Sequence, residues 1–339
     1  MQTAHRVLVV GAGSIGERHL RCFRATGRAV VGFVEVKPEL RQDVASRYHG
    51  AAAYESLEQA LADGYTAAVV ATPAPMHVSQ ATQLADAGLH LLIEKPLSLS
   101  LDGIDAMLGA VRARQLTAAV AYVYRAHPIL SEMREAVVGG EFGRPLELVA
   151  VSGQHFPFYR PAYRDTYYAR RETGGGAVQD ALTHIINAAQ WLVGLAQRVI
   201  ADADHCLLPG VEVEDTVHVL ARHGGVLASY SLNQHQAPNE LTISVICQRG
   251  TARFEYHTSS WKSVIEPGQQ WTVRAEVALE RDTLFTQQAN AFLDTIERRR
   301  PTLCSLEEGM DSVRITTAIL KSIESRSWCD VKEAAHAFA

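Results

Sequence analysis

The sequence predicts an α/β fold, with a parallel sheet in the N-terminal third and an α+β part with a mostly antiparallel sheet after it. Up to about residue 124, short apolar runs alternate with segments of helical apolar spacing. The first run leads directly into a glycine-rich turn at 11–16. Beyond residue 124 the alternation stops, and short polar turns between apolar runs indicate hairpins.

The first part is predicted to alternate strands and helices, which implies right-handed crossovers and parallel strands. Gly27 and Gly88 stand where helices should end, and Pro38 suits the first turn of a helix. The expected strands are 7–10, 30–34, 67–71, 90–93 and 117–121, and the expected helices are 16–26, 38–48, 57–62, 76–87 and 101–114.

The turn after the first strand has the pattern G-x-G-x-x-G. Gly11 permits the tight turn, Gly13 lets the backbone approach a diphosphate, and Gly16 lets the next helix pack against the strand. The free N–H groups at the helix start, at Ser14 and Ile15, would hold that diphosphate. The pattern predicts a dinucleotide site, and the alternative is a glycine turn with no ligand.

Side chains after the other strands support this site. Glu35 ends the second strand about 20 residues after Gly16, where a carboxylate should accept hydrogen bonds from the adenosine ribose. Thr72, Pro73 and His77 follow the third strand and would pass near a ribose of the cofactor. An incidental acid near a glycine turn is the alternative for Glu35.

The fourth strand ends in Glu94-Lys95-Pro96. A lysine beside a bound dinucleotide sits where hydride chemistry occurs. Burial or the charge of an oxidised nicotinamide would lower the pKa of Lys95, which could then exchange a proton with a substrate hydroxyl. Glu94 could orient Lys95 or contact the nicotinamide region. The alternative is a pair of solvated charges in a loop.

The fifth strand ends near Tyr122 and Arg125, a natural crossing between domains. We therefore expect a dinucleotide-binding domain at 1–124 and a second domain at 125–339, whose strands joined by short turns form an antiparallel sheet. Its expected helices are 128–138, 176–192, 283–298 and 305–325, and its expected strands are 145–154, 217–222, 226–232, 241–247, 251–256, 261–265 and 271–277.

A second chemical group follows three glycines at 174–176. Asp180 and His184 are spaced i, i+4, which places them on one face of a helix, where a carboxylate can fix the tautomer of an imidazole. His184 would be the base for a hydroxyl proton, and the glycines would let the helix begin close to a ligand. The alternative is a capping aspartate and a packed histidine.

The segment 156–173 is rich in tyrosine and arginine. Tyr159, Arg160, Tyr167 and Arg170 in this loop, together with Tyr122 before it, are candidate substrate-binding residues. Forked guanidinium groups and aromatic rings suit sugars, carboxylates and phosphates. The alternative is an oligomer arm, because both residue types are also enriched at protein interfaces.

The composition narrows the function classes. A net charge of −5, with no basic run beyond 298–300, argues against nucleic acid as a partner. The five cysteines are scattered, without metal-ligand spacing, which predicts free thiols in a reducing compartment and no metal. No apolar stretch is long enough for a membrane span. We expect a cytoplasmic protein without a signal peptide.

The motifs together resemble the glucose-fructose oxidoreductase/inositol dehydrogenase/rhizopine-catabolism (Gfo/Idh/MocA) family over essentially the whole chain. The matching motifs are Gly11-x-Gly13-x-x-Gly16-x-x-His19, Thr72-Pro73-x-x-x-His77, Glu94-Lys95-Pro96, Tyr122-x-x-Arg125 and Gly174-Gly175-Gly176-x-x-x-Asp180-x-x-x-His184. The resemblance implies a Rossmann domain, then an α+β domain with a large, mostly antiparallel open sheet that forms homodimers or homotetramers.

The resemblance also implies site residues. Lys95 matches the lysine that contacts the reacting hydroxyl, His184 the usual acid/base and Asp180 the carboxylate beside it. Glu35 matches a position that is more often Asp in members preferring NAD. A carboxylate there should repel a 2′-phosphate, which favours NAD over NADP, although Lys37 could reach a phosphate. Thr72, Pro73, His77, Glu94 and Arg125 would join the glycine turn in holding the cofactor.

The predicted function is the transfer of a hydride between NAD and a secondary alcohol of a sugar, sugar nucleotide or cyclic polyol. The turn at 13–19 and the loop before the three glycines look like those of members that act on sugar nucleotides. One alternative is a glycoside hydrolase that uses NAD for transient oxidation at C3. A non-catalytic cofactor-binding sensor is the other, and proteins of that kind lack the lysine and the histidine.

Overall fold

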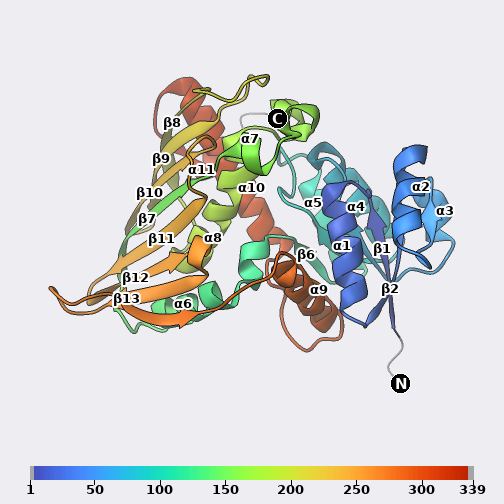
Figure 1. Cartoon of the computed structure of the whole chain (residues 1–339), viewed down its shortest axis with the longest axis horizontal. Helices are drawn as coiled ribbons and strands as arrows, with labels where there is room; N and C mark the ends of the chain where they lie inside the picture. Colours follow the sequence, from blue (N-terminus) through green and yellow to red (C-terminus); the bar gives the residue numbers. More distant parts are fainter. Residues whose placement is uncertain (1–3, 335–339) are drawn as a thin grey trace. The chain divides into compact units, whose positions relative to one another are not determined.

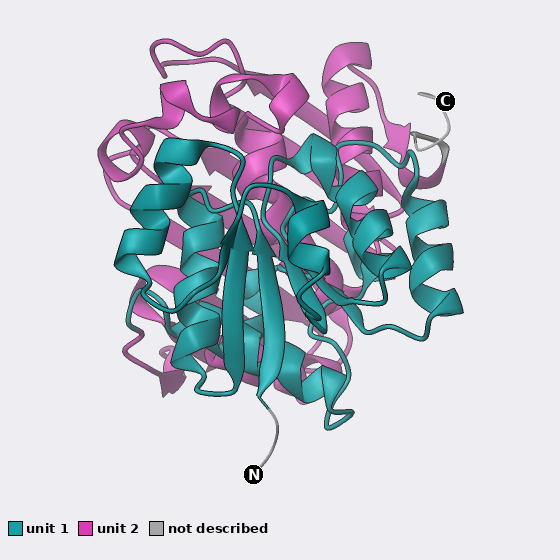
Figure 2. Cartoon of the chain, turned by 90° about the vertical axis from the view of Figure 1, so that its right-hand side faces the viewer, with its two compact units in different colours: residues 1–126, 280–310 teal, residues 127–279, 311–339 magenta. Residues whose placement is uncertain are grey.

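The computed structural model describes residues 4–334, which form two compact units (Figure 2). Unit 1 comprises residues 1–126 and 280–310, and unit 2 comprises residues 127–279 and 311–339. Among the helices of the described residues, none combines the length and the apolar character that crossing a membrane requires.

The described part of unit 1 contains a parallel sheet, as predicted, of which Figure 1 labels β1, β2 and β6. It has six strands rather than the five expected, in the order β3-β2-β1-β4-β5-β6. The order reverses between β1 and β4, and ligands of such sheets bind at that point, at the carboxyl ends of the strands. The strands are β1 His5–Val10, β2 Ala29–Val34, β3 Ala53–Tyr54, β4 Ala67–Val70, β5 His90–Ile93 and β6 Ala118–Val120.

The sequence did not predict β3, which is an edge strand of only two residues. The helices of unit 1 otherwise fall close to their expected positions. They are α1 Ser14–Ala25, α2 Pro38–Arg47, α3 Leu57–Leu61, α4 His77–Asp86, α5 Ile104–Ala113 and α9 Thr283–Ile296.

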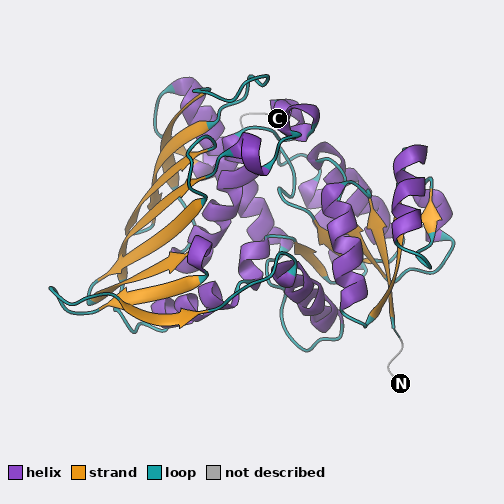
Figure 3. Ribbon diagram, in the orientation of Figure 1, coloured by secondary structure: helices purple, strands orange, loops and turns teal. Residues whose placement is uncertain are grey.

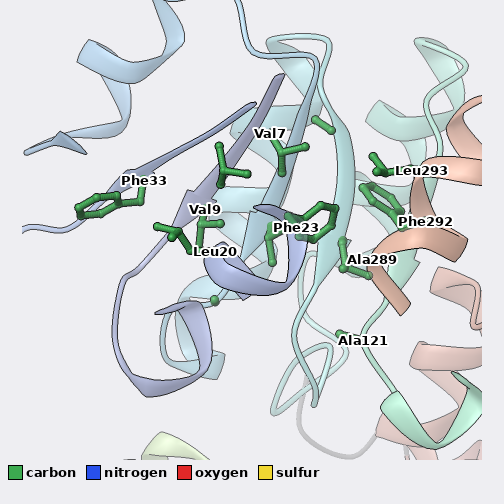
Figure 4. Close-up of a cluster of buried hydrophobic side chains, with 14 of the residues drawn as sticks. Val7, Val9, Leu20, Phe23, Phe33, Ala121, Ala289, Phe292 and Leu293 are labelled. Carbon is green, nitrogen blue, oxygen red and sulfur yellow. The ribbon is translucent and has the colours of Figure 1, made fainter. Parts of the chain in front are cut away.

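Helix α9 brings a late part of the chain into the core of unit 1. Phe292 meets Phe23 of α1 with their rings edge to face at 6.3 Å (Figure 4). Ala289 and Leu293 are buried in the same cluster, with Val7 and Val9 of β1 and Phe33 of β2. The expected second domain, 125–339, contains this helix. The apolar stripe of an amphipathic helix shows that it packs, but not against which sheet.

Unit 2 has a sheet that is nine-stranded in the described residues, in the order β14-β13-β12-β11-β7-β10-β9-β8-β15. All neighbouring pairs are antiparallel except β10 with β7, which confirms the mostly antiparallel sheet. The strands are β7 Pro145–Gly153, β8 Arg198–Asp204, β9 Thr216–His223, β10 Val226–Asn233, β11 Glu240–Cys247, β12 Gly250–Glu255, β13 Ser260–Val264, β14 Thr272–Glu276 and β15 Cys329–Asp330.

Helices cover one face of this sheet (Figure 3). They are α6 Pro128–Val138, α8 Thr183–Val193 and the part of α10 (Leu306–Ser325) that belongs to unit 2. Strand β9 shows the consequence, because Val217, Val219 and Ala221 are buried, whereas His218 and Leu220 between them are exposed.

One histidine of unit 2 has a marked pKa shift. His127 precedes α6, is fully buried and meets Phe254 edge to face at 4.9 Å. In the described part of the chain neither ring nitrogen has a hydrogen-bond partner. Burial lowers the pKa of His127 from 6.5 to about 4.

This shift predicts that acid destabilises the protein through His127. The unfolded chain takes up a proton at this imidazole below pH 6.5 and the folded chain only below about pH 4, so stability falls as the pH drops through that window. Urea unfolding should show that wild type loses about 2 kcal/mol more than His127→Phe between pH 7 and pH 5. Other buried histidines are common to both proteins, so parallel losses would contradict the prediction.

Candidate active site

The glycine turn links β1 to α1. Gly11 has a φ of +89°, in the left-handed region that favours glycine. A Cβ on Gly16 would lie 1.8 Å from the carbonyl oxygen of Gly11, so only glycine lets the helix begin this close to the strand. A Cβ on Gly13 would meet no atom within 4 Å. The turn therefore leaves open space where the backbone is expected to approach a diphosphate, which fits a dinucleotide.

Glu35 is bonded to the same turn. Its carboxylate is buried and accepts hydrogen bonds from the backbone N–H of Ala12, at 3.0 Å, and of Lys37, at 3.0 Å. The spacing in the sequence predicted a carboxylate close to the turn, and the structure places it there. Its contact with a ribose remains a prediction.

The loop after β5 is fixed by a buried ion pair. Glu94 Oε1 lies 2.7 Å from His19 Nε2 of α1, and Glu94 Oε2 accepts the backbone N–H of Lys95 at 3.0 Å. Burial alone would raise the pKa of Glu94, but its hydrogen bond to His19 and the charges of His19 and Lys95 hold it below the usual value. Of the two roles expected for Glu94, this geometry favours the orientation of Lys95.

His77 holds the same loop from its other side. Its Nδ1 lies 2.9 Å from the carbonyl oxygen of Pro96, and its Nε2 lies 2.8 Å from the carbonyl oxygen of Thr72. The side chain is 1% exposed. With both ring nitrogens within hydrogen-bond distance of a backbone carbonyl oxygen, His77 joins two loops of the site, and its contact with the cofactor remains a prediction.

The remaining predicted residues of unit 1 are also placed by the structure. Thr72 donates its hydroxyl hydrogen to the Gln80 side chain at 2.6 Å. The next residue, Pro73, is exposed. Tyr122 is buried. The buried guanidinium of Arg125 bonds to Glu308 at 2.8 Å. Their contacts with cofactor or substrate remain predictions.

In unit 2, Asp180 lies in a wide helical turn, Val178–Leu182, that continues into α8. Wide turns of this kind are frequent at functional sites. Asp180 is buried, and its carboxylate accepts the hydroxyl hydrogen of Tyr167 at 2.6 Å. His184 lies one turn further on and is partly exposed. The pairing of Asp180 with His184 remains a prediction.

The glycines before this helix are required by the packing of the chain itself, and the expected closeness of the helix to a ligand remains a prediction. A Cβ on Gly175 would lie 2.1 Å from the carbonyl oxygen of Tyr168, and one on Gly176 would lie 2.4 Å from Glu214 Oε1. Gly176 also has a φ of +92°. These glycines let the chain's own loop and Glu214 lie against the start of the helix.

The aromatic loop 156–173 divides into two faces. Phe156, Tyr163 and Tyr168 are buried in a small cluster with Leu208 and Val213. The four residues of this loop that were predicted to bind substrate all have exposed side chains: Tyr159, Arg160, Tyr167 and Arg170. The sequence could not separate the buried from the exposed rings.

One group in the described residues brings together atoms of the kind that bind metals. Such atoms of Cys206, Asp215 and His235 lie within 4.8 Å of one another. Both carboxylate oxygens of Asp215 already accept hydrogen bonds, at 2.8–3.0 Å, from the backbone N–H groups of 206–208 and the hydroxyl of Thr216. We therefore assign this group a structural role.

Two functional candidates were missed from the sequence. His19 was noted only as part of a motif, and its partner Glu94 is 75 residues away. Glu214 was not noticed, because no local pattern marks a carboxylate that meets a helix 36 residues before it.

Comparisons with known proteins cover both units. Residues 5–122 match the model of the oxidoreductase family, NAD-binding Rossmann fold, and residues 130–253 match that of the GFO/IDH/MocA C-terminal domain. Levoglucosan dehydrogenase of Pseudarthrobacter phenanthrenivorans is 24% identical over 383 residues, covering 96% of this chain and 97% of that protein. UDP-N-acetylglucosamine 3-dehydrogenase of Acidithiobacillus ferrooxidans is 22% identical over 321 residues, with 93% and 95% covered.

Solved structures have the same fold. A structure of levoglucosan dehydrogenase in complex with NADH matches with a TM-score of 0.88. It is 22% identical, and the match covers 97% of this chain and 99% of that one.

Proposed function

This chain belongs to the GFO/IDH/MocA family of oxidoreductases, with an NAD-binding Rossmann domain, and from this we propose its reaction. It oxidises a secondary alcohol of a sugar, sugar nucleotide or cyclic polyol. The observation that carries the proposal is the Lys95 loop, which Glu94 and His19 bond to the helix that starts at the glycine turn. Lys95 thus stands at the nucleotide-binding end of the parallel sheet.

The residues present fit NAD. The open space at Gly13 and the first N–H groups of α1 suit a diphosphate, and the buried Glu35 carboxylate suits the ribose hydroxyls. The same carboxylate would repel a 2′-phosphate, which favours NAD over NADP. When bound, NAD supplies the acceptor for the hydride.

Oxidation of an alcohol also needs a base, because the proton leaves separately from the hydride. In the proposed reaction His184 takes the hydroxyl proton while the carbon–oxygen double bond forms. Asp180 stabilises the resulting imidazolium, and Lys95 donates a hydrogen bond to the reacting oxygen. Tyr167 donates to Asp180 and so helps to fix that carboxylate.

The substrate class is supported by the exposed face of the loop 156–173 and by the relatives. Tyr159, Arg160 and Arg170 offer rings and guanidinium groups on that face. Two relatives along nearly the whole chain are named as dehydrogenases of levoglucosan and of UDP-N-acetylglucosamine. A carbohydrate or its nucleotide derivative is therefore the class proposed for this chain.

A screen of sugars, inositols and sugar nucleotides tests the proposal, with NAD and NADP supplied side by side. We expect absorbance at 340 nm to rise with at least one compound, and more with NAD than with NADP. His184→Ala should lower that rate by about a hundredfold or more. A substrate consumed with no net NADH would instead favour a hydrolase with transient oxidation.

We also propose that the open sheet face of unit 2 forms a homodimer. Val151, Leu220 and Leu227 on this face are 46%, 55% and 49% exposed. Register pairs Ile200 with Leu220, so the apolar surface at Leu220 continues onto the neighbouring strand β8. Exposed apolar patches of this kind are typical of protein interfaces.

Leu220→Glu should therefore yield a monomer. A buried charge at the centre of the interface costs more than the contact provides. Light scattering after gel filtration should give the 37.0 kDa mass of one chain for this variant and a multiple of it for wild type. Leu195→Glu, at an equally exposed leucine after α8, is the control. A monomeric wild type would contradict the proposal.

A further inference from the structure

Glu214 lies on the connection between β8 and β9 and meets the start of the helix that carries Asp180. Its side chain is only 5% exposed. Its Oε1 accepts the backbone N–H of Val178 at 3.1 Å, and its own carbonyl oxygen accepts the N–H of Ala177 at 2.9 Å. A single residue thus bonds to two successive N–H groups in the first turn of the helix, where the helix has no acceptors of its own.

The backbone at Gly176, just before the helix, is shaped to accommodate this carboxylate. Any side chain on Gly176 would overlap both carboxylate oxygens of Glu214, at 2.4 and 2.8 Å from its Cβ. The left-handed φ of Gly176 turns the chain so that the next two N–H groups face Glu214. Gly176 and Glu214 therefore act together to bond the first turn of the helix.

The second oxygen of Glu214 connects this helix to the aromatic loop. Oε2 accepts a hydrogen bond from Arg171 at 2.9 Å, and the arginine side chain is 41% exposed. Burial raises the pKa of Glu214, and the charge of Arg171 opposes that shift. The same loop donates the Tyr167 hydroxyl to Asp180. The loop and the helix are thus joined at two points, at Val178 through Glu214 and at Asp180 directly, which lie two residues apart along the helix.

We propose that Glu214, held by Arg171, is a positioning residue that fixes the first turn of the helix and thereby the direction of the Asp180 carboxylate. This role rests on the proposed function, in which Asp180 and His184 act on the substrate hydroxyl. Arg171 belongs to the loop expected to contact substrate. Its ion pair with Glu214 therefore also links the conformation of that loop to the conformation of the helix that carries Asp180 and His184.

Glu214→Gln tests the role, because it keeps the shape of the side chain and removes its charge. We expect amide hydrogens of residues 177–184 to exchange about tenfold faster, since the first turn loses its anionic acceptor. With a substrate from the screen, kcat should fall about tenfold, whereas KM for NAD should stay within about twofold. Arg171→Met changes a side chain that is 41% exposed. It should likewise raise the exchange rate at 177–184 and lower kcat.

Glu255→Gln is the matched control. Glu255 also accepts a hydrogen bond from a cation, Lys262 at 2.8 Å, but it lies at the end of β12, where its carboxylate also bonds to Thr258 of the short 3-10 turn Tyr256–Thr258. It should alter neither exchange at 177–184 nor kcat.

Two results would overturn the proposal. Unchanged exchange in Glu214→Gln shows that Glu214 does not hold the helix. Faster exchange with an unchanged kcat shows that it only stabilises the fold. A wild type with no hydride transfer to or from any compound refutes the proposed function instead, and the exchange measurement still decides whether Glu214 fixes the helix.

Discussion

Methionine in place of Lys95 is expected to lower kcat for alcohol oxidation by about 10³-fold and to leave NADH binding within about twofold. Methionine fills a similar volume but donates no hydrogen bond and carries no charge, so the reacting oxygen loses its stabilising partner. The backbone of the loop should remain in place, because Glu94 and His77 hold it through the Lys95 N–H and the Pro96 carbonyl oxygen.

Rates of NADH formation and fluorescence titration with NADH measure the two quantities separately. Lys321→Met, in the unit 2 part of α10, is the matched control and should retain wild-type rates. If Lys95→Met kept more than a tenth of the wild-type kcat, Lys95 would not be the residue that acts on the substrate hydroxyl.

The second large effect concerns alanine substitutions of two glycines in one turn. One should lower the stability of the protein, and the other its affinity for NADH. Gly16→Ala would place its Cβ 1.8 Å from the Gly11 carbonyl oxygen, so α1 must move away from β1. We expect this to cost about 3 kcal/mol of unfolding free energy or more. Gly13→Ala meets no atom within 4 Å and has φ −64°, which alanine adopts readily.

Gly13→Ala should therefore stay within about 1 kcal/mol of wild-type stability, the cost of alanine at a helix N-cap. Its added methyl group would stand where the diphosphate is expected, so the Kd for NADH should rise about tenfold or more. Urea unfolding and NADH titration give the unfolding free energy and the Kd for NADH of each variant. Normal NADH binding by Gly13→Ala would show that the diphosphate does not approach this residue.

Local periodicity was enough to predict most of the fold. The long strands of unit 1 and the hairpins of unit 2 follow apolar runs bounded by glycine or polar turns, as at 223–225 between β9 and β10. Strand β3 has two residues, too few for any period, and β15 is equally short. Strand β8, Arg198–Asp204, was also not predicted, because its short apolar run is interrupted by two aspartates. The parallel pairing of β10 with β7 was not predicted, because the residues it joins, such as Glu147 and Leu227, are far apart in the sequence.

The candidate site was predicted where residue types recur at fixed spacing. Gly11, Gly16 and Glu35 belong to one βαβ unit, so their spacing in the sequence carries their arrangement. The partners of Glu94 and Asp180 come from other segments, and only the fold brings His19 and Tyr167 to them. The packing role of Gly176 was not predicted for the same reason, since the glutamate that it accommodates lies on a distant connection.

The return of α9 to unit 1 also bears on how the chain matures during synthesis. Domains generally fold as units as they leave the ribosome, the N-terminal one first. Here Phe23 packs against Phe292, which is synthesised much later. The NAD-binding unit therefore cannot complete its core until most of unit 2 has been made. The nascent first 126 residues would meet chaperones with an unfinished apolar face, and a stop codon before α9 would leave that face exposed permanently.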